Sequence, residues 1–271
     1  MPTGGTFLDI GSHIGWYSFL FAFFNYSVIA VEAMPSNQRA FEHTACANPT
    51  LAKRITLVRS ALVAPDTPRP CFTKQPLGSN NTGNGVLACG SEAATQCATG
   101  AFRCEQVRTQ TLNQLLKQLG ETVTKDIVAV KMDTEGAECD IMRGGQTLFE
   151  IRPPPLIQLE GGNKAIASCV IEQAGDHALA LGSGRGHDKN LVLIDPQRMV
   201  SADRSRAACP RGCRAYHLDG WKPHCRFGPP GHRCWLRPRG GSEQKPARLL
   251  GAPPSNSCDA AALFRDVIDG P

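Results

Sequence analysis

Short apolar runs alternate with longer stretches of helical periodicity along the first 200 residues. The apolar runs are too hydrophobic to be half-exposed, and they predict buried strands at 6–10, 27–31, 55–62, 127–132 and 156–159. The stretches between them predict helices at 15–23, 35–47, 111–119 and 138–149. This alternation is typical of parallel strands joined by crossover helices. The sequence therefore predicts an α/β, Rossmann-like fold, a mostly parallel sheet with helices on both faces.

One segment interrupts this alternation inside the predicted domain. Residues 65–100 contain several prolines and a run rich in Gly and Asn, and they predict a long structureless loop or insertion. We expect this segment to face the substrate, because long loops in compact domains are often functional. Residues 102–108 predict a strand that returns to the sheet, and 190–194 predict an antiparallel strand at its edge. The folded domain should then span 1–198.

The remaining residues, 199–271, predict an irregular, partly disordered tail rich in Cys, Pro and Gly. Residues 1–200 carry 17 Lys and Arg against 18 Asp and Glu, whereas 201–250 carry 11 against 3. Such a basic segment can attract nucleic acid, acidic glycans or anionic lipid, and charge alone selects none of these. Cys and His residues between 209 and 234 match no standard zinc spacing, so a loose or disulfide-bonded tail is favoured over a metal site.

The composition narrows the class of protein and the compartment. With 41% hydrophobic and 20% charged residues, a disordered or fibrous protein is excluded. Twelve cysteines are many for a cytosolic enzyme, but the N-terminus lacks the charged and apolar segments of a signal peptide, so the cytoplasm is favoured over a secretory lumen. The apolar run 14–24 is about half the length that spans a bilayer, and we expect no transmembrane segment. The oxidation state of the cysteines and the oligomeric state stay open.

The clearest chemical signal lies where the first strand meets the first helix, in Phe-Leu-Asp-Ile-Gly-Ser-His-Ile-Gly at 7–15. Gly11 and Gly15 allow a tight turn close to a ligand, and the following helix offers unpaired N–H groups. Asp9 can order this turn and reach a cofactor. Glu32 ends the second strand, where a carboxylate can accept both hydroxyls of a ribose. The glycine spacing differs from that of dinucleotide-binding folds, which disfavours an NAD enzyme.

A second group of charged residues follows the fourth predicted strand, at 130–138. The carboxyl ends of parallel strands form the ligand crevice, so Lys131, Asp133 and Glu135 should face the space above the first motif. Glu138 suits the first turn of a helix, and we assign it a structural role. Glu160 ends the fifth strand, where it could line a pocket, help to hold a divalent cation or have no role.

These motifs together resemble the FkbM family of S-adenosylmethionine (SAM)-dependent methyltransferases, a branch of the class I methyltransferases. The matching stretches occur in the family's order, at 7–18, 31–35, 111–116 and 131–138. The resemblance implies that the turn carrying Asp9, Gly11 and Gly15 binds SAM and that Glu32 holds the ribose. His13 stands in this turn where the family usually has Asn.

The resemblance also implies a chemistry. Family members resemble O-methyltransferases that act on hydroxyls of sugars or natural products, so we expect a small-molecule or glycan acceptor and no nucleic acid. An alcohol is a poor nucleophile, and a base or a metal must help to remove its proton. Asp133 or Glu135 could serve as this base, with Lys131 orienting them or the acceptor. We assign no metal ligands.

Two further interpretations stay open. A methyltransferase fold without activity could bind a partner through its basic tail, an idea that the short N-terminus and His13 favour. A nucleic-acid methyltransferase could use the Arg-rich tail for phosphate contacts. Against the latter, no Asn-Pro-Pro-Tyr-like tetrapeptide follows the fourth strand, as it does in the amino-directed enzymes of that class.

Overall fold

The structure is a computed structural model, and it describes most of the chain up to residue 175. The described residues are 4–78, 85–151, 154, 156–160, 164–175, 179–182, 190–194, 199–200, 217–218, 221–226, 233–238, 263–264 and 266–269. Most of the predicted tail, with the side chains of its Cys and His residues, lies outside them. Within the described part of the chain, no helix is long and apolar enough to cross a membrane.

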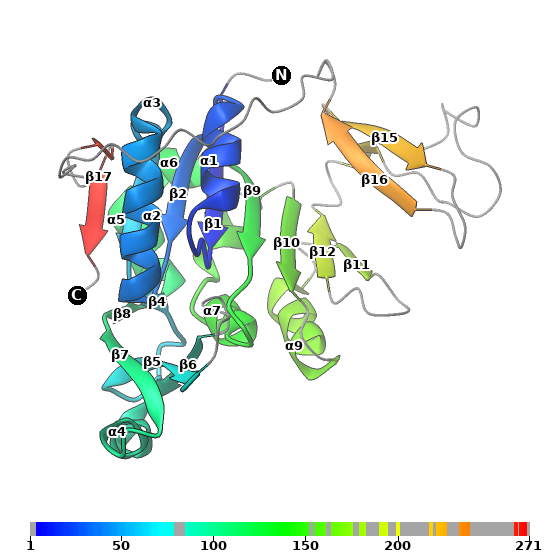
Figure 1. Ribbon diagram of the computed structural model, residues 1–271. Coiled ribbons are helices and arrows are strands. Elements are labelled where there is room, and N and C mark those ends of the chain that lie inside the picture. Colours follow the sequence, from blue (N-terminus) through cyan, green and yellow to red (C-terminus); the bar gives the residue numbers. More distant parts are fainter. Residues whose placement is uncertain are drawn as a thin grey trace.

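The centre of the molecule is an eight-stranded sheet in the order β11-β12-β10-β9-β1-β2-β3-β17 (Figure 1). Its strands are β1 (Thr6–Ile10), β2 (Ser27–Val31), β3 (Ile55–Arg59), β9 (Ile127–Met132), β10 (Leu156–Glu160), β11 (Leu179–Gly182), β12 (Asn190–Ile194) and β17 (Asp266–Asp269). β12 pairs antiparallel with both of its neighbours, and the other pairs are parallel. The predicted mostly parallel α/β sheet is confirmed. The edge position expected for 190–194 is wrong, because β11 pairs outside it.

Helices cover both faces of this sheet. They are α1 (Trp16–Phe23), α2 (Pro35–Ala47), α3 (Pro49–Ala52), α5 (Leu112–Leu119), α6 (Glu121–Lys125), α7 (Glu138–Arg143), α8 (Thr147–Ile151) and α9 (Lys164–Ala174). Two of the starts have local causes. Pro35 at the first turn of α2 has the φ that a helix requires and lacks the N–H that would be unpaired there. Thr111 and Gln114 form a capping box that begins α5.

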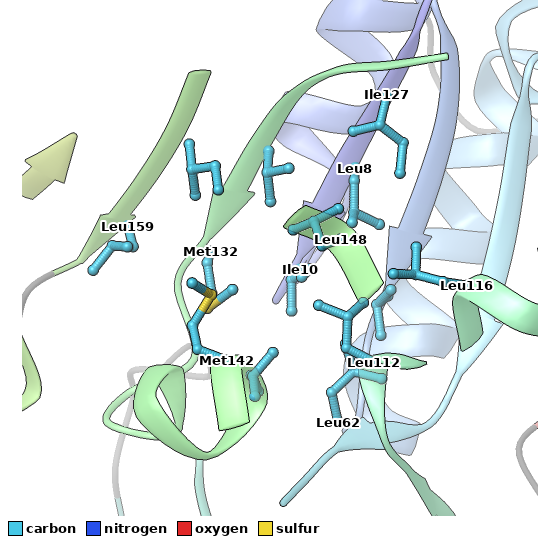
Figure 2. Packing of buried hydrophobic residues seen from close by; sticks show 14 of the residues in the cluster. Leu8, Ile10, Leu62, Leu112, Leu116, Ile127, Met132, Met142, Leu148 and Leu159 are labelled. Atoms are coloured by element: carbon cyan, nitrogen blue, oxygen red, sulfur yellow. The ribbon is translucent and has the colours of Figure 1, made fainter. Parts of the chain in front are cut away.

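Two hydrophobic clusters fill the space between the sheet and its helices. Successive side chains of a strand point to opposite faces, so Phe7 and Leu8 of β1 enter different clusters. Phe7 stacks on Phe21 of α1 and belongs to the same cluster as Phe41 of α2. Leu8 belongs to the other cluster, which is shown in Figure 2 together with residues of α5, α7 and α8. Burial of both faces explains why the strands are apolar throughout and lack alternation.

Two predicted elements are each divided in the structure. The single strand expected at 55–62 is interrupted after β3, and its end forms β4 (Ala61–Leu62), which pairs with β8 (Thr109–Gln110). The single helix expected at 138–149 breaks at Gly144 and Gly145 into α7 and α8. A Cβ atom on Gly144 would lie 2.7 Å from the carbonyl oxygen of Val63, and one on Gly145 would lie 2.6 Å from Leu112. Close packing against the neighbouring segments therefore accounts for the glycine pair.

The segment expected to be a structureless loop at 65–100 instead contains most of a small antiparallel sheet. β5 (Cys71–Pro76) lies between β6 (Val86–Cys89) and β7 (Phe102–Val107), and α4 (Gly90–Ala98) connects β6 to β7. We call residues 65–107 the insertion. The sequence did not predict these strands, because alternate side chains of β5 become buried only when β5 pairs with β6 and β7.

Disulfides link elements of the insertion and of the main domain. Cys71–Cys89 joins β5 to β6, Cys97–Cys104 joins α4 to β7, and Cys139–Cys169 joins α7 to α9. Disulfides persist in oxidising compartments and are rare in the cytosol.

The predicted tail contains further strands. β13 (Met199–Val200) pairs with β14 (His217–Leu218), and β15 (Trp221–Arg226) pairs with β16 (Arg233–Pro238). Near the end of the chain, β17 pairs parallel with β3, and Phe264 is buried against Phe41 with ring centroids 5.8 Å apart. Residues 263–264 and 266–269 thus belong to the core and the sheet, and a boundary at 198 leaves out an edge strand.

We predict that Phe264→Ala lowers the free energy of unfolding by about 3 kcal/mol, because it removes a ring from a packed core. Phe23→Ala is the matched control, since Phe23 is half-exposed on α1. Denaturant unfolding followed by circular dichroism measures both. Equal, small effects of the two substitutions would show that the C-terminal segment contributes nothing to the stability of the domain.

Candidate functional site

The sheet has a switch point between β1 and β9. From β1 the chain proceeds through β2 to β3 on one side, and β9 and β10 then extend the sheet on the other side. Ligands of open α/β sheets bind outside the carboxyl ends of the strands at such a point. A cavity of about 240 Å³ lies there, between the turn that follows β1 and the turn that follows β9.

The turn after β1 requires its two glycines for different reasons. Gly11 has a φ of 75°, and a Cβ atom on it would lie 1.9 Å from the carbonyl oxygen of Asp133. Gly15 has a φ of 91°, and a Cβ atom there would lie 2.8 Å from the rings of Phe19 and Phe41. Gly11 lines the cavity, whereas Gly15 allows α1 to pack closely on the core.

His13 lies between these glycines with a left-handed φ of 52°. Asn, Asp and His adopt this conformation more readily than other non-glycine residues, so His suits this position of the turn. Its backbone N–H donates to Oε2 of Glu32 over 2.8 Å. Burial and the neighbouring Lys131 lower the pKa of the imidazole, which favours its neutral form.

Glu32 lines the cavity from the end of β2 and is almost completely buried. Besides the bond from His13, its Oε1 accepts from the backbone N–H of Met34 at 2.8 Å and from Nδ2 of Asn37 at 3.4 Å. Burial raises the pKa of this carboxyl group to about 7, against the lowering effect of these hydrogen bonds. A carboxylate has about four lone-pair sites, so capacity remains for hydroxyl donors from the cavity.

Asp9 does not reach the cavity wall, contrary to the expectation that it contacts a ligand. Its side chain is fully buried, and Oδ2 accepts from the hydroxyl of Ser18 on α1 at 2.6 Å. Burial raises the pKa of Asp9, and the ammonium of Lys131, 3.6 Å from Oδ1, opposes this effect. Asp9 therefore positions α1 and Lys131, and any effect on a ligand passes through them.

Lys131 connects the two turns. Its ammonium donates to the carbonyl oxygen of Gly11 at 3.0 Å and lies 3.4 Å from Oδ2 of Asp133. It also lies 5.3 Å from the centroid of the Tyr17 ring, within the range of a cation–π contact. Lys131 also lines the cavity. Its positive charge is thus shared between the buried carboxylate of Asp9 and the carboxylate of Asp133, which faces the cavity.

The turn after β9 presents Asp133 and Glu135 to the same cavity. The side chain of Asp133 is 43% exposed, and the left-handed φ of Glu135 is 53°. Glu138 is buried beneath this turn, and its Oε1 accepts from the backbone N–H of Thr134 at 2.9 Å and that of Gly136 at 3.4 Å. The structural role predicted for Glu138 is thus confirmed, and it consists of holding the turn.

The insertion also lines this cavity, in line with the expectation that 65–100 faces the substrate, but the sequence did not identify which of its residues do so. Thr73, Gly85 and Leu87 line it, and a Cβ atom on Gly85 would lie 2.0 Å from the terminal methyl of Met34. The insertion therefore packs directly on the segment that follows β2. A signal for this contact existed in the Gly-rich run before β6, but its length suggested an open loop.

A metal site finds no support in the part of the chain that the structure describes. No group of three or more His, Cys, Asp or Glu side chains is placed there to hold a metal ion. Glu160, a candidate for such a site, ends β10, and the position of its side chain is outside the described set.

A comparison with known protein families identifies the family of the chain. The model of the methyltransferase FkbM domain matches residues 9–177, which is more than half of the chain. The chain belongs to the FkbM methyltransferase family. The match begins at Asp9 within β1 and includes the turn after β1, the insertion and the turn after β9.

Solved structures that resemble this FkbM domain are also methyltransferases, at low similarity. The precorrin-6y C5,15-methyltransferase of Geobacter metallireducens has 14% identity and a TM-score of 0.37, over 70% of this chain and 78% of that one. The glycopeptide N-methyltransferase MtfA has 12% identity and a TM-score of 0.35, over 71% and 83%. The methyltransferase domain of bacterial CtHen1-CN has 10% identity and a TM-score of 0.37, over 71% and 91%. No curated protein sequence matches the chain.

The cofactor of the FkbM domain is SAM, and the residues at the switch point fit it. Glu32 retains acceptor capacity for ribose hydroxyls, and the buried hydroxyl of Ser12, which lines the cavity, has no hydrogen-bond partner among the described residues. Three carboxylates and one ammonium line the cavity, which suits a sulfonium cation. These carboxylates belong to Glu32, Asp133 and Glu135.

The raised pKa of Glu32 predicts how the stability of the FkbM domain depends on pH. Folding favours the protonated carboxyl group, so its stabilising contribution is complete below about pH 4.5 and is lost as the pH rises through 7. Relative to Glu32→Gln, the wild-type protein should lose on the order of 3 kcal/mol between pH 4.5 and 8. Thermal unfolding at several pH values measures this difference.

Glu121→Gln is the control for this experiment. Glu121 is exposed on α6, before the amino end of β9, whereas the cavity lies at the carboxyl end of this strand. The stability of Glu121→Gln should follow that of the wild type at every pH. If the stabilities of the wild type and Glu32→Gln change with pH in parallel, the assignment of the raised pKa to Glu32 is contradicted.

Proposed function

We propose that this protein is a SAM-dependent methyltransferase that transfers a methyl group to a hydroxyl of a small molecule or glycan. The observation that carries the proposal is the cavity at the switch point. Glu32 borders it on the β2 side, and Lys131 with Asp133 borders it on the β9 side. One cavity thus contains Glu32, which can accept hydrogen bonds from ribose hydroxyls, and Asp133, a carboxylate placed to lie near the methyl group of SAM.

Glu32, Ser12 and the turn at Gly11 would hold SAM. When bound, SAM supplies a methyl group on a positively charged sulfur that an oxygen nucleophile can attack. Glu32 accepts hydroxyl donors in its ionised form, and the hydroxyl of Ser12 can pair with a polar group of the cofactor. Asp9 contributes as a positioning residue through Lys131 and Ser18.

Asp133 is our candidate for the general base. It faces the cavity and is partly exposed, and the ammonium of Lys131 3.4 Å away restricts its position. A base held within reach of the acceptor hydroxyl can accept its proton as the new bond to oxygen forms. Glu135 lies two residues further along the same turn, on the side where the acceptor would approach.

The disulfides support a location for this activity. Three pairs within the described residues link the insertion internally and α7 to α9. We place the protein in an oxidising compartment, where these pairs persist, and not in the cytoplasm.

Binding of SAM tests the proposal directly. Isothermal titration calorimetry should give micromolar affinity for SAM and none for NAD. Glu32→Ala should weaken SAM binding by at least about tenfold, because hydrogen bonds to a charged acceptor are lost. Glu121→Ala should leave the affinity unchanged. Binding of neither cofactor would favour a non-catalytic protein, and binding of NAD alone would refute the proposal.

Transfer itself tests the assignment of the base. With a mixture of neutral sugars as acceptors, Asp133→Asn should lower the rate of S-adenosylhomocysteine release by about 100-fold or more. The affinity for SAM should fall much less than the rate, because Asn has nearly the size of Asp and the carboxylates of Glu32 and Glu135 remain in the cavity. A variant with full activity would exclude Asp133 as the base and direct attention to Glu135.

A further inference from the structure

A second cavity adjoins the one at the switch point. It has a volume of about 410 Å³, and the two cavities share five lining residues, Leu62, Leu87, Thr134, Glu135 and Ala137. The shared residues belong to β4, to β6 of the insertion and to the turn after β9. A molecule in the second cavity would therefore lie beside Glu135, next to the space assigned to the cofactor.

The insertion forms a firmly held wall of this second cavity. Val86, Leu87 and Cys89 line it from β6, and the Cys71–Cys89 disulfide ties this strand to β5. On the other side of the small sheet, Glu105 of β7 accepts from both the backbone N–H and the hydroxyl of Ser36 at the start of α2. The insertion is thus attached to the same helix that begins beside the cofactor cavity.

The charges of the second cavity are unbalanced. Three carboxylates line it, from Asp66, Glu135 and Asp140, against one guanidinium, from Arg143. Arg143 lies 3.4 Å from carboxylate oxygens of both Asp66 and Asp140. Its positive charge is therefore already paired with two carboxylates at the surface, which makes it a poor partner for an anionic ligand.

Apolar side chains also line the second cavity. They belong to Leu62, Val63, Pro68, Val86 and Leu87. A ligand that fits this mixed lining needs apolar surface together with hydroxyl or ammonium donors for the carboxylates. Pyranose rings and small aminated polyols have this combination, whereas phosphates and carboxylates would face like charges.

We infer that the second cavity is the acceptor site and that it selects neutral or cationic polyhydroxy compounds over anionic ones. This inference rests on the proposed function, because it places the acceptor next to the methyl donor. It assigns Asp140 and Asp66 as specificity-determining residues, which act through their charge. It also gives the insertion a function as the wall against which the apolar face of the acceptor packs.

Four ligands, each with a single sugar ring, test this inference. They are methyl glucoside, glucosamine, glucose 6-phosphate and glucuronic acid, and their binding is measured by saturation-transfer NMR on the full chain. The measurements are made with and without S-adenosylhomocysteine. We expect the neutral and the amino probe to bind at least about fivefold more tightly than the two anionic probes.

Variants locate the selectivity. Asp140→Lys should reduce or reverse the preference, since Asp140 is exposed on α7 and its replacement leaves the core intact. Glu121→Lys makes the same charge change on α6 and should have no effect. Preferential binding of an anionic probe by the wild type, binding of no probe, or an Asp140→Lys variant with unchanged selectivity would each overturn the inference. Calorimetry with S-adenosylhomocysteine on the same samples shows separately whether the cofactor site functions.

Discussion

The buried ammonium of Lys131 is the interaction on which the site depends. It lies between the fully buried carboxylate of Asp9, the carbonyl oxygen of Gly11 and the exposed carboxylate of Asp133. Burial of one of these charges without the others would carry a large desolvation penalty, and loss of one partner of such a pair typically costs about 3–5 kcal/mol. The electrostatics of a single side chain therefore keep the ends of β1 and β9 in a fixed relation across the switch point.

This constraint divides the acidic residues of the site into two kinds. Asp9 and Glu138 are buried and hold the two turns, Asp9 through Lys131 and Ser18, and Glu138 through the backbone of the turn after β9. Glu32 and Asp133 line the cavity, and each keeps acceptor capacity for a ligand. The two motifs thus consist of residues that line the cavity and residues that position them. Sequence spacing alone does not separate the two groups.

The insertion extends the site beyond the residues of the family motifs. Its strands are linked by disulfides, it contacts Met34 through Gly85, and Glu105 fixes it to the start of α2. Because it borders both cavities, the insertion contributes to the proposed acceptor site as well as to the cavity at the switch point.

The sequence by itself determined the sheet and the place of the chemistry. The apolar strands at 6–10, 27–31 and 127–132 and the glycines at the first turn follow from local patterns, since buried parallel strands need unbroken apolar runs and tight turns need positive φ. Tertiary structure alone decided that Asp9 is buried and does not line the cavity, that β17 completes the edge, and which residues of the insertion line the cavity. These outcomes depend on contacts between residues distant in the chain, and such contacts leave no periodic signal in the sequence.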